Sequence, residues 1–167
     1  GAETARELAL RGWDVTLVTG SLGGPDADAD ASNFFSGVQV DTVDYTEAYE
    51  AADPFAVDPP MHPAFEDRED APDRVFAKLG DEDYERQVAA WQRALEDAGA
   101  GDADVLHLNH LTPINEAAMR SFPDVPRIGH LHGTELLMLR DIVEGPPAGW
   151  DHAAEWEGRL RRWAQAC

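Results

Sequence analysis

Cysteine and lysine are nearly absent from this chain, which contains one of each, Cys167 and Lys78. A single cysteine excludes an internal disulfide framework and favours a reducing compartment. No apolar run approaches the length that a bilayer-spanning helix requires, and no secretory signal pattern opens the chain. We therefore expect a cytoplasmic protein, with a peripheral position at a membrane as the second option.

Several catalytic and ligand-binding motifs are also missing. The chain has no Gly-x-Ser-x-Gly elbow and no glycine-rich Walker pattern, which argues against serine hydrolases and P-loop nucleotide hydrolases. Its histidines lack the spacing of a structural zinc site and have no cysteine nearby. We expect neither a bound metal ion nor a cofactor.

Positive charge is scarce, because 13 lysine and arginine residues stand against 33 aspartate and glutamate residues, a formal net charge of −20. Nucleic acids and anionic membranes both require a basic patch, so we expect no nucleic-acid partner. An acidic, lysine-poor surface suits a high-salt cytoplasm, where screening weakens self-repulsion. A halophilic source is one hypothesis, and an acidic surface encoded by a GC-rich genome is the other.

The length of 167 residues and the hydrophobic content of 43% indicate one globular domain over 1–167. Hydrophobic spacing predicts strands over 13–19, 38–43, 104–109 and 127–131. It predicts helices over 1–11, 82–98, 113–122 and 135–143, and a last helix that opens at Asp151. Such alternation is typical of an α/β fold with a mostly parallel sheet and helices on both faces.

Local signals add detail to these elements. We expect Gly12 to end the first helix and Asp81 to cap the helix over 82–98. Three tryptophans recur at helical spacing and are expected in the core or at a domain interface, not as sugar-stacking platforms: Trp91, Trp156 and Trp163.

Two segments are predicted to be surface loops. Residues 52–73 contain five prolines, too many for the interior of a helix or strand. Residues 20–37 are rich in glycine and aspartate, and we expect the run Asp26–Asp30 to be solvated. Loops of this kind would set the choice of ligand.

The stretch from Arg127 to Leu139 is the least ordinary part of the sequence. A short apolar strand runs into His130-Leu-His132, and Gly133 allows a sharp turn into a helix. A corner of this kind, at the carboxyl end of a strand, is where open α/β sheets bind ligands. We expect His132 to face a cleft, and His130, deeper on the same face, to pack in the core.

Three segments in this order carry a resemblance to a known family: GAETARELALRGWDVTLVTG, DVLHLNHLTP and HLHGTELLML. Together they resemble the N-terminal domain of family 4 glycosyltransferases, retaining enzymes of the GT-B type. Residues 1–3 resemble the end of that family's Gly-Gly-x-Glu turn, and 12–16 resemble the following strand, with Trp13 where histidine is commoner. Residues 104–110 resemble its His-rich strand end, with Asn109 in place of a frequent second histidine, and 132–135 resemble its His-Gly-Thr corner.

The resemblance implies two Rossmann-like domains facing each other across a cleft. The N-terminal domain would hold mainly the acceptor, and the C-terminal domain, with a Glu-x7-Glu motif, mainly the nucleotide-sugar. This chain would be most of the first domain, with a doubly wound sheet that lacks its first strand, and it would be inactive alone. The implied reaction transfers a sugar from the nucleotide-sugar to an acceptor hydroxyl with retention, the acceptor being a glycan, a lipid or a small molecule.

The resemblance also gives roles to single residues. It places His132 next to the transferred sugar as a catalytic hydrogen-bond donor, a role that imidazole suits because its second nitrogen can be oriented by the backbone. It places Gly1 at the donor diphosphate, where a backbone N–H and a helix amino end meet negative charge. A structural histidine and an ordinary terminal glycine are the alternatives.

Further polar residues are candidates for the acceptor cleft. Asn109 and Thr112 could instead cap the helix that starts at Pro113. Thr134 could be an N-cap and Glu135 a first-turn carboxylate that the helix dipole favours. The full set of cleft candidates is Asn109, His110, Thr112, Gly133, Thr134 and Glu135.

Two other functions compete with glycosyl transfer. One is another GT-B enzyme, such as a sugar-nucleotide epimerase, because the half that would distinguish them is missing. The other is a non-catalytic α/β binding domain, such as a partner subunit that supplies the other half. The sequence beyond Cys167 would discriminate between these functions and glycosyl transfer.

Overall fold

The computed structural model describes residues 2–23, 27–35, 37–68 and 71–167. Its helices and strands follow the predicted alternation, with α2 added after the second strand. Short 3-10 turns cover Ala31–Phe34, Phe76–Lys78 and Ala100–Asp102. The main elements are α1 (Ala2–Leu10), β1 (Thr16–Ser21), β2 (Gln39–Asp44), α2 (Thr46–Glu50), α3 (Asp81–Asp97), β3 (Leu106–Asn109), α4 (Pro113–Ser121), β4 (Arg127–His130), α5 (Thr134–Glu144) and α6 (Ala153–Ala166).

The strands form two parallel pairs. β1 pairs with β2 in a register that joins Thr16 to Gln39, and β3 pairs with β4 in a register that joins Asn109 to His130. The α/β class and the parallel pairing are thus confirmed. A single continuous sheet is not, because no ladder among the described residues joins β1 to β3.

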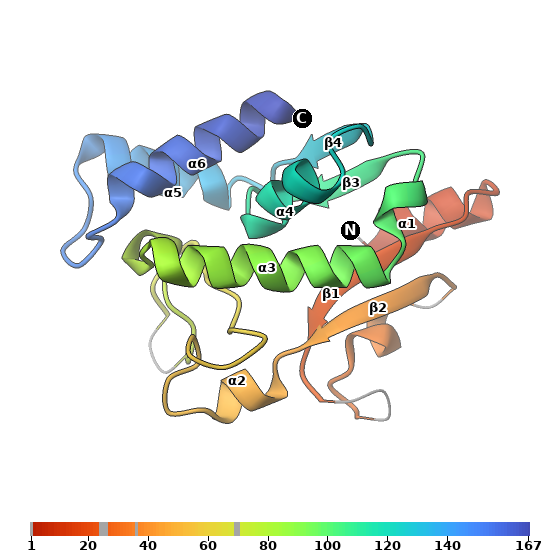
Figure 1. Ribbon diagram of the computed structural model, residues 1–167, viewed down its shortest axis with the longest axis horizontal. Coiled ribbons are helices and arrows are strands. Elements are labelled where there is room, and N and C mark those ends of the chain that lie inside the picture. Colours follow the sequence, from red (N-terminus) through yellow and green to blue (C-terminus); the bar gives the residue numbers. More distant parts are fainter. Residues whose placement is uncertain (1, 24–26, 36, 69–70) are drawn as a thin grey trace.

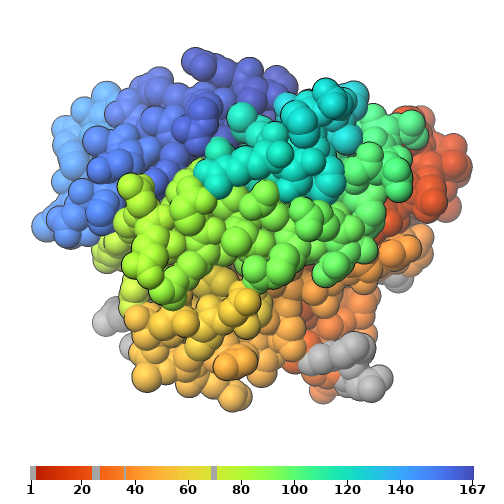
Figure 2. Space-filling view, viewed as in Figure 1, coloured from red at the N-terminus to blue at the C-terminus, as the bar shows by residue number. Residues whose placement is uncertain are grey.

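Helix α3 lies in front of the strands in Figure 1, with β2 below it and β3 and β4 above. Its side chains form a continuous band across the same face in Figure 2. The helix is amphipathic, as its spacing predicts, and it buries Tyr84, Val88, Trp91 and Leu95. Burial of an aliphatic side chain such as Val88 or Leu95 stabilises the fold by roughly 1.5–3 kcal/mol.

The core gathers around the aromatic side chains of α6. Trp156 and Trp163 are fully buried, and the indole N–H of Trp156 donates a 2.8 Å hydrogen bond to the carbonyl oxygen of Leu79. Trp91 is also buried, so the core placement predicted for the three tryptophans is confirmed. No helix within the described ranges has the length and apolar character to cross a bilayer.

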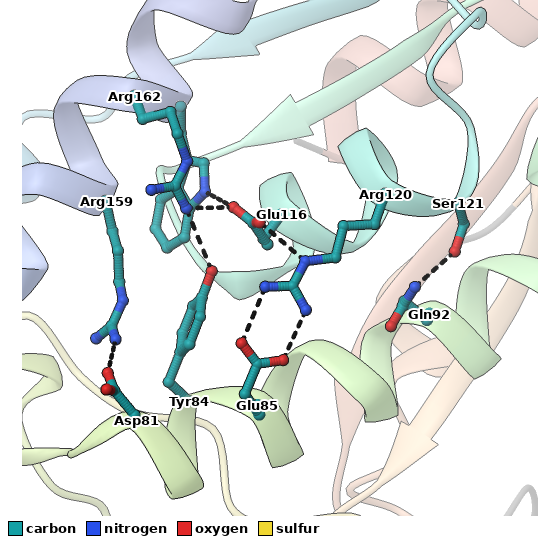
Figure 3. A network of polar contacts seen from close by, with 10 residues as sticks. Asp81, Tyr84, Glu85, Gln92, Glu116, Arg120, Ser121, Arg159 and Arg162 are labelled. Atoms are coloured by element: carbon teal, nitrogen blue, oxygen red, sulfur yellow. Dashed lines mark hydrogen bonds and ion pairs between the residues drawn. The ribbon is translucent and has the colours of Figure 1, made fainter.

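A polar network fastens α4 to α3 and α6, as Figure 3 shows. The Glu116 carboxylate accepts hydrogen bonds from Arg162 at 2.6 Å, from Arg120 at 2.9 Å and from the Trp163 indole at 2.9 Å. Burial disfavours the charged carboxylate, but the donors from Arg162, Trp163 and Arg120 outweigh it and lower the pKa of Glu116 to about 2. Arg120 also donates two hydrogen bonds to Glu85 on α3, at 2.6 and 2.9 Å.

Several local expectations need correction. Asp81 does not cap α3, because Gly80 is the N-cap and the Asp81 carboxylate instead pairs with Arg159. Residues 52–73 do lack a helix or strand of their own in their described part, but they are no simple surface excursion, since Phe55 is 1% exposed in the core. Asp30 is not solvated, because it is buried and accepts hydrogen bonds from Ser21 and Ser32.

Other expectations are confirmed within a few residues. Gly12 follows α1 with a φ of +91°, a backbone conformation that favours glycine at a helix end. Thr112 is the N-cap of α4 with Pro113 at the first helical position, although the Thr112 side chain makes no capping bond. β1 begins at Thr16 instead of Trp13, which is half-exposed.

Candidate functional site

The candidate site lies where β3 and β4 end side by side. Asn109 is the last residue of β3, His130 is the last residue of β4, and the register pairs them directly. Parallel strands bring their carboxyl ends to one edge, so the predicted corner meets the predicted strand end here. Burial along β3 alternates, with Leu106 and Leu108 inside, and leaves Asn109 on the outer face.

Glu135 is the buried anchor of the corner. Its side chain is fully buried, and its Oε2 accepts backbone N–H groups of Gly133 at 3.1 Å and His132 at 3.3 Å. These are donors at a helix amino end, which otherwise lack partners. Although burial disfavours ionisation, backbone donors and His110 outweigh it and hold the pKa of Glu135 below its usual range.

Glu135 is therefore more than a first-turn carboxylate that the helix dipole favours. Gly133, with a φ of +101°, is the N-cap of α5, and Thr134 is the first helical residue, so the expected Thr134 cap is wrong. The Thr134 hydroxyl instead approaches Oε2 of Glu135 at 3.4 Å. A carboxylate two residues after the turn performs the capping that Thr134 was expected to perform.

His110 is held in an unusual backbone conformation above this carboxylate. Its φ of +64° lies in the left-handed region, which non-glycine residues rarely adopt. Its backbone N–H donates to the carbonyl oxygen of His130 at 2.9 Å, and its own carbonyl accepts from the Asn115 amide at 3.0 Å. The His110 Nδ1 lies 2.7 Å from Oε1 of Glu135. Because an ionised Glu135 can only accept, Nδ1 of His110 carries the proton of this hydrogen bond.

His132 is exposed at the same edge. Its Nε2 lies 3.1 Å from Oδ1 of Asn109, and an amide oxygen only accepts, so Nε2 carries the proton. The Nδ1 of a neutral His132 ring is then an acceptor. His132 can donate to a ligand only by leaving Asn109 or by taking up a second proton. His132 can therefore act as the expected hydrogen-bond donor only after one of these two changes, which the sequence did not indicate.

Four imidazole rings stack along this edge. The ring centroids lie 5.5 Å apart for His107 and His130, 4.6 Å apart for His130 and His132, and 4.2 Å apart for His132 and His110. Burial lowers the pKa of His132, and the neighbouring His110 and His130 rings lower it further, which favours the neutral ring. The core position predicted for His130 is wrong, because the side chain is exposed in this stack.

A large cavity of about 1430 Å³ opens beside the corner. Among the predicted cleft residues, Gly133 and Glu135 do not line it, because Glu135 lies beneath the corner and holds it in place. The predicted residues that do line this cavity are Asn109, His110, Thr112, His132 and Thr134.

His62 also lines the cavity, although the sequence did not single it out. It lies in the proline-rich segment, and its ring packs edge-on against Phe76 and Trp91 at 5.8 and 6.1 Å. Burial is the main cause that lowers the pKa of His62 to about 4, so this ring is neutral near pH 7. A histidine between prolines in a segment without regular periodicity carries no signal that would place it here.

Within the described ranges, no three His, Cys, Asp or Glu side chains are grouped to hold a metal ion. The proposed diphosphate residue Gly1 lies outside the described residues, as does Asp26 of the predicted solvated run.

Comparison with the models of protein families, with curated proteins and with solved structures yields no match to this chain. The chemistry of the corner is therefore the basis for any functional assignment.

Proposed function

We propose that this chain is the acceptor-side domain of a retaining glycosyltransferase, whose second domain binds the nucleotide-sugar. One observation carries the proposal. Polar groups from the carboxyl ends of β3 and β4 line one large cavity, and His132 is exposed there with a fixed tautomer. An α/β domain with a concave, mostly apolar cavity and a few convergent polar groups suits a small-molecule or glycan ligand.

The proposal includes a Rossmann-like arrangement in which both parallel pairs belong to one doubly wound sheet. The alternation of helices and strands and the parallel direction of both ladders support it. In this arrangement the β3–β4 edge forms one wall of a cleft, and a nucleotide-sugar domain forms the other.

The chemistry of the corner suits positioning more than covalent catalysis. The lowered pKa of His132 favours its neutral ring, which accepts at Nδ1 and can orient a hydroxyl group of a sugar or an acceptor. Buried Glu135 fixes the His110 ring as a carboxylate orients a catalytic imidazole. Glycosyl transfer with retention, in which the leaving phosphate assists deprotonation of the acceptor, requires this kind of positioning.

The test uses the complete gene product. The coding sequence is extended beyond Cys167, and the full protein is assayed for release of nucleotide from nucleotide-sugars, with the anomeric configuration of the product read by NMR. We expect a second Rossmann-like domain with a Glu-x7-Glu motif and transfer with retention. A stop codon directly after Cys167, or a full-length protein that binds no nucleotide-sugar, would refute the assignment.

A matched pair of variants tests whether His132 at the corner takes part in the reaction. In the full-length enzyme, His132→Ala is expected to lower kcat by roughly 100-fold, the cost of losing one positioned polar group. His152→Ala serves as the control because His152 precedes α6 and does not line the cavity. Equal turnover in both variants would remove His132 from the mechanism.

A further inference from the structure

Two buried residues present hydroxyl groups to the cavity without an internal hydrogen-bond partner. Tyr45 is 6% exposed and Thr112 is 5% exposed, and both line the cavity. Among the described residues, neither hydroxyl has a hydrogen-bond partner, and Thr112 makes no side-chain capping bond. Neither oxygen belongs to the described polar atoms that are sealed from water without a partner, so both reach the cavity. Buried hydroxyl groups are normally paired within the protein, and these two remain available to a ligand.

Tyr45 is held in place at the ends of β1 and β2. It directly follows β2, and its backbone N–H donates to the carbonyl oxygen of Ser21 at 2.9 Å. Gly20 of β1 leaves room for the ring, because a Cβ atom at that position would lie 2.5 Å from Cε2 of Tyr45. Burial raises the pKa of the Tyr45 hydroxyl above its usual range, so the phenol is neutral. A neutral phenol can both donate and accept a hydrogen bond.

These hydroxyl groups extend the candidate site across the cavity. Tyr45 follows β2, Asn109 ends β3, and Thr112 precedes α4, and all three line the cavity. His62 adds a neutral imidazole, since burial lowers its pKa to about 4. The half-buried ring of Phe65 lines the cavity as well and offers an apolar surface. Neutral hydrogen-bonding groups beside an apolar ring match the hydroxyl groups and the C–H face of a sugar.

The charged residues that line the cavity cannot neutralise an anion. Within the described part of the chain, Arg68 is the one lining residue that is a lysine or arginine, and it forms an ion pair with Asp73. An anion that enters the cavity therefore loses hydration without gaining a free cation. The net charge of −20 repels it further. The carboxylates that line the cavity are those of Asp14, Glu66, Asp73, Asp102 and Asp104.

We propose that the cavity binds the acceptor as an uncharged, hydroxyl-rich molecule, a neutral sugar, with the Tyr45 and Thr112 hydroxyls as direct hydrogen-bond partners. A phosphorylated sugar, an acidic sugar or a phospholipid headgroup does not fit, because its charge has no counterpart here. The description of this ligand as the acceptor rests on the proposed glycosyl transfer. The class of the ligand rests on the hydroxyl groups and the charges of the cavity.

A cationic amino sugar is the competing ligand, because carboxylates line the cavity. Asp14 precedes β1, and Asp102 and Asp104 precede β3, whereas the two hydroxyls follow the other ends of the strands. Asp73 is already paired with Arg68. Among the described lining carboxylates, these relations favour a neutral ligand at Tyr45 and Thr112, and an amino sugar belongs in the test.

Binding of matched sugars tests the ligand class without any turnover. The complete gene product is labelled with fluorotyrosine, and fluorine NMR follows the Tyr45 resonance, which is assigned by its loss in Tyr45→Phe. Glucose, galactose and mannose are each compared with their 6-phosphates in the absence of nucleotide-sugar, and glucosamine is the cationic probe. We expect a neutral sugar to shift the Tyr45 resonance and to bind roughly tenfold or more tightly than its phosphate, which meets uncompensated carboxylates.

Variants that lack one hydroxyl locate the binding groups. Tyr45→Phe and Thr112→Val remove the oxygen and retain most of the side-chain shape. Each should weaken the binding of the neutral sugar by roughly three- to tenfold in calorimetry, the effect of losing one hydrogen bond. Tyr49→Phe is the matched control, because Tyr49 of α2 is 52% exposed and does not line the cavity.

Three results would overturn the proposal. The first is a 6-phosphate or glucosamine that binds as tightly as the matched neutral sugar. The second is a Tyr45 resonance that no neutral sugar shifts, and the third is equal sugar affinity in Tyr45→Phe, Thr112→Val and Tyr49→Phe. Neutral sugars that bind at Tyr45 in a protein that releases no nucleotide would argue against glycosyl transfer alone. Transfer to a tightly bound phosphorylated acceptor would argue against the neutral-sugar inference alone.

Discussion

The His110 ring donates a hydrogen bond from Nδ1 to Oε1 of Glu135 across 2.7 Å, and Glu135 has no exposed surface. The other oxygen of the same carboxylate accepts the N–H groups of Gly133 and His132. One buried carboxylate therefore sets both the turn into α5 and the orientation of an imidazole that lines the cavity.

Replacement of Glu135 by glutamine should loosen both contacts. An amide offers one accepting oxygen, so it cannot accept from His110 and from the corner N–H groups together. We expect Glu135→Gln to lower the free energy of unfolding by about 2 kcal/mol, the cost of a buried donor left without its partner. Urea titration measures this effect. The control is Glu144→Gln at the exposed end of the same helix, which should change stability by less than about 0.5 kcal/mol.

Replacement of Asn109 by aspartate should change the protonation of His132. The new carboxylate would accept from Nε2 as the amide oxygen does, at the same position 3.1 Å away. Its negative charge favours the charged ring, so the pKa of His132 should rise from its lowered value. NMR titration of the imidazole resonances measures the change. Asn33→Asp, in the short turn after β1, is the control. If Asn33→Asp raised the pKa of His132 as much as Asn109→Asp does, direct contact between Asn109 and His132 would be contradicted.

The Glu116 network should make the free energy of unfolding decrease at acidic pH. The pKa of Glu116 lies at about 2 in the folded chain and near 4.5 when unfolded, so the unfolded state binds the proton more readily. Its contribution is fully present above about pH 4.5 and is lost as pH falls toward 2. Glu116→Gln should cost about 3 kcal/mol at pH 7, because Arg162 and Arg120 lose a buried anion.

Glu85→Gln is the matched control for Glu116→Gln. Glu85 contacts Arg120 from a half-exposed position, and exposed pairs contribute about 1 kcal/mol or less. Urea titration at pH 7 and at pH 3 should show the loss for Glu116→Gln shrinking at low pH. A loss for Glu85→Gln as large as that for Glu116→Gln would show that burial does not set the strength of this network.

The charge of −20 predicts a strong response to salt. Charges of one sign on a compact surface repel each other, and in about 1 M KCl the Debye length falls to about 3 Å. We expect the melting temperature to rise steadily between dilute buffer and molar KCl. An equal melting temperature at low and high salt would exclude the halophilic hypothesis. The acidic surface would then not need salt to screen its charges.

Local sequence patterns were sufficient to predict most of the helices and strands. The apolar spacing of 82–98 and the position of Pro113 predicted α3 and α4 within one or two residues, because these signals depend on contacts within one or two turns. The corner at Gly133 was also predicted, since its positive φ suits glycine and sharply bends the chain.

Contacts between residues far apart in sequence were not predictable in the same way. Glu135 looked like a first-turn carboxylate, and only its contact with a residue 25 positions earlier makes it the anchor of the corner. Asp81, Asp30 and His130 were misplaced for the same reason, since their partners or exposure depend on neighbouring elements. His62 had no periodic context that could indicate its position at the cavity.

The sequence by itself determined the alternation of helices and strands, the parallel α/β class and the location of the polar corner. These follow from hydrophobic spacing and from the conformational preferences of glycine and proline, which act over a few residues. Only the tertiary structure decided that the described strands form two separate pairs, that β1 and β3 line one cavity, and that Glu135 is buried. Those features depend on which distant segments pack together, and packing is a property of the whole folded chain.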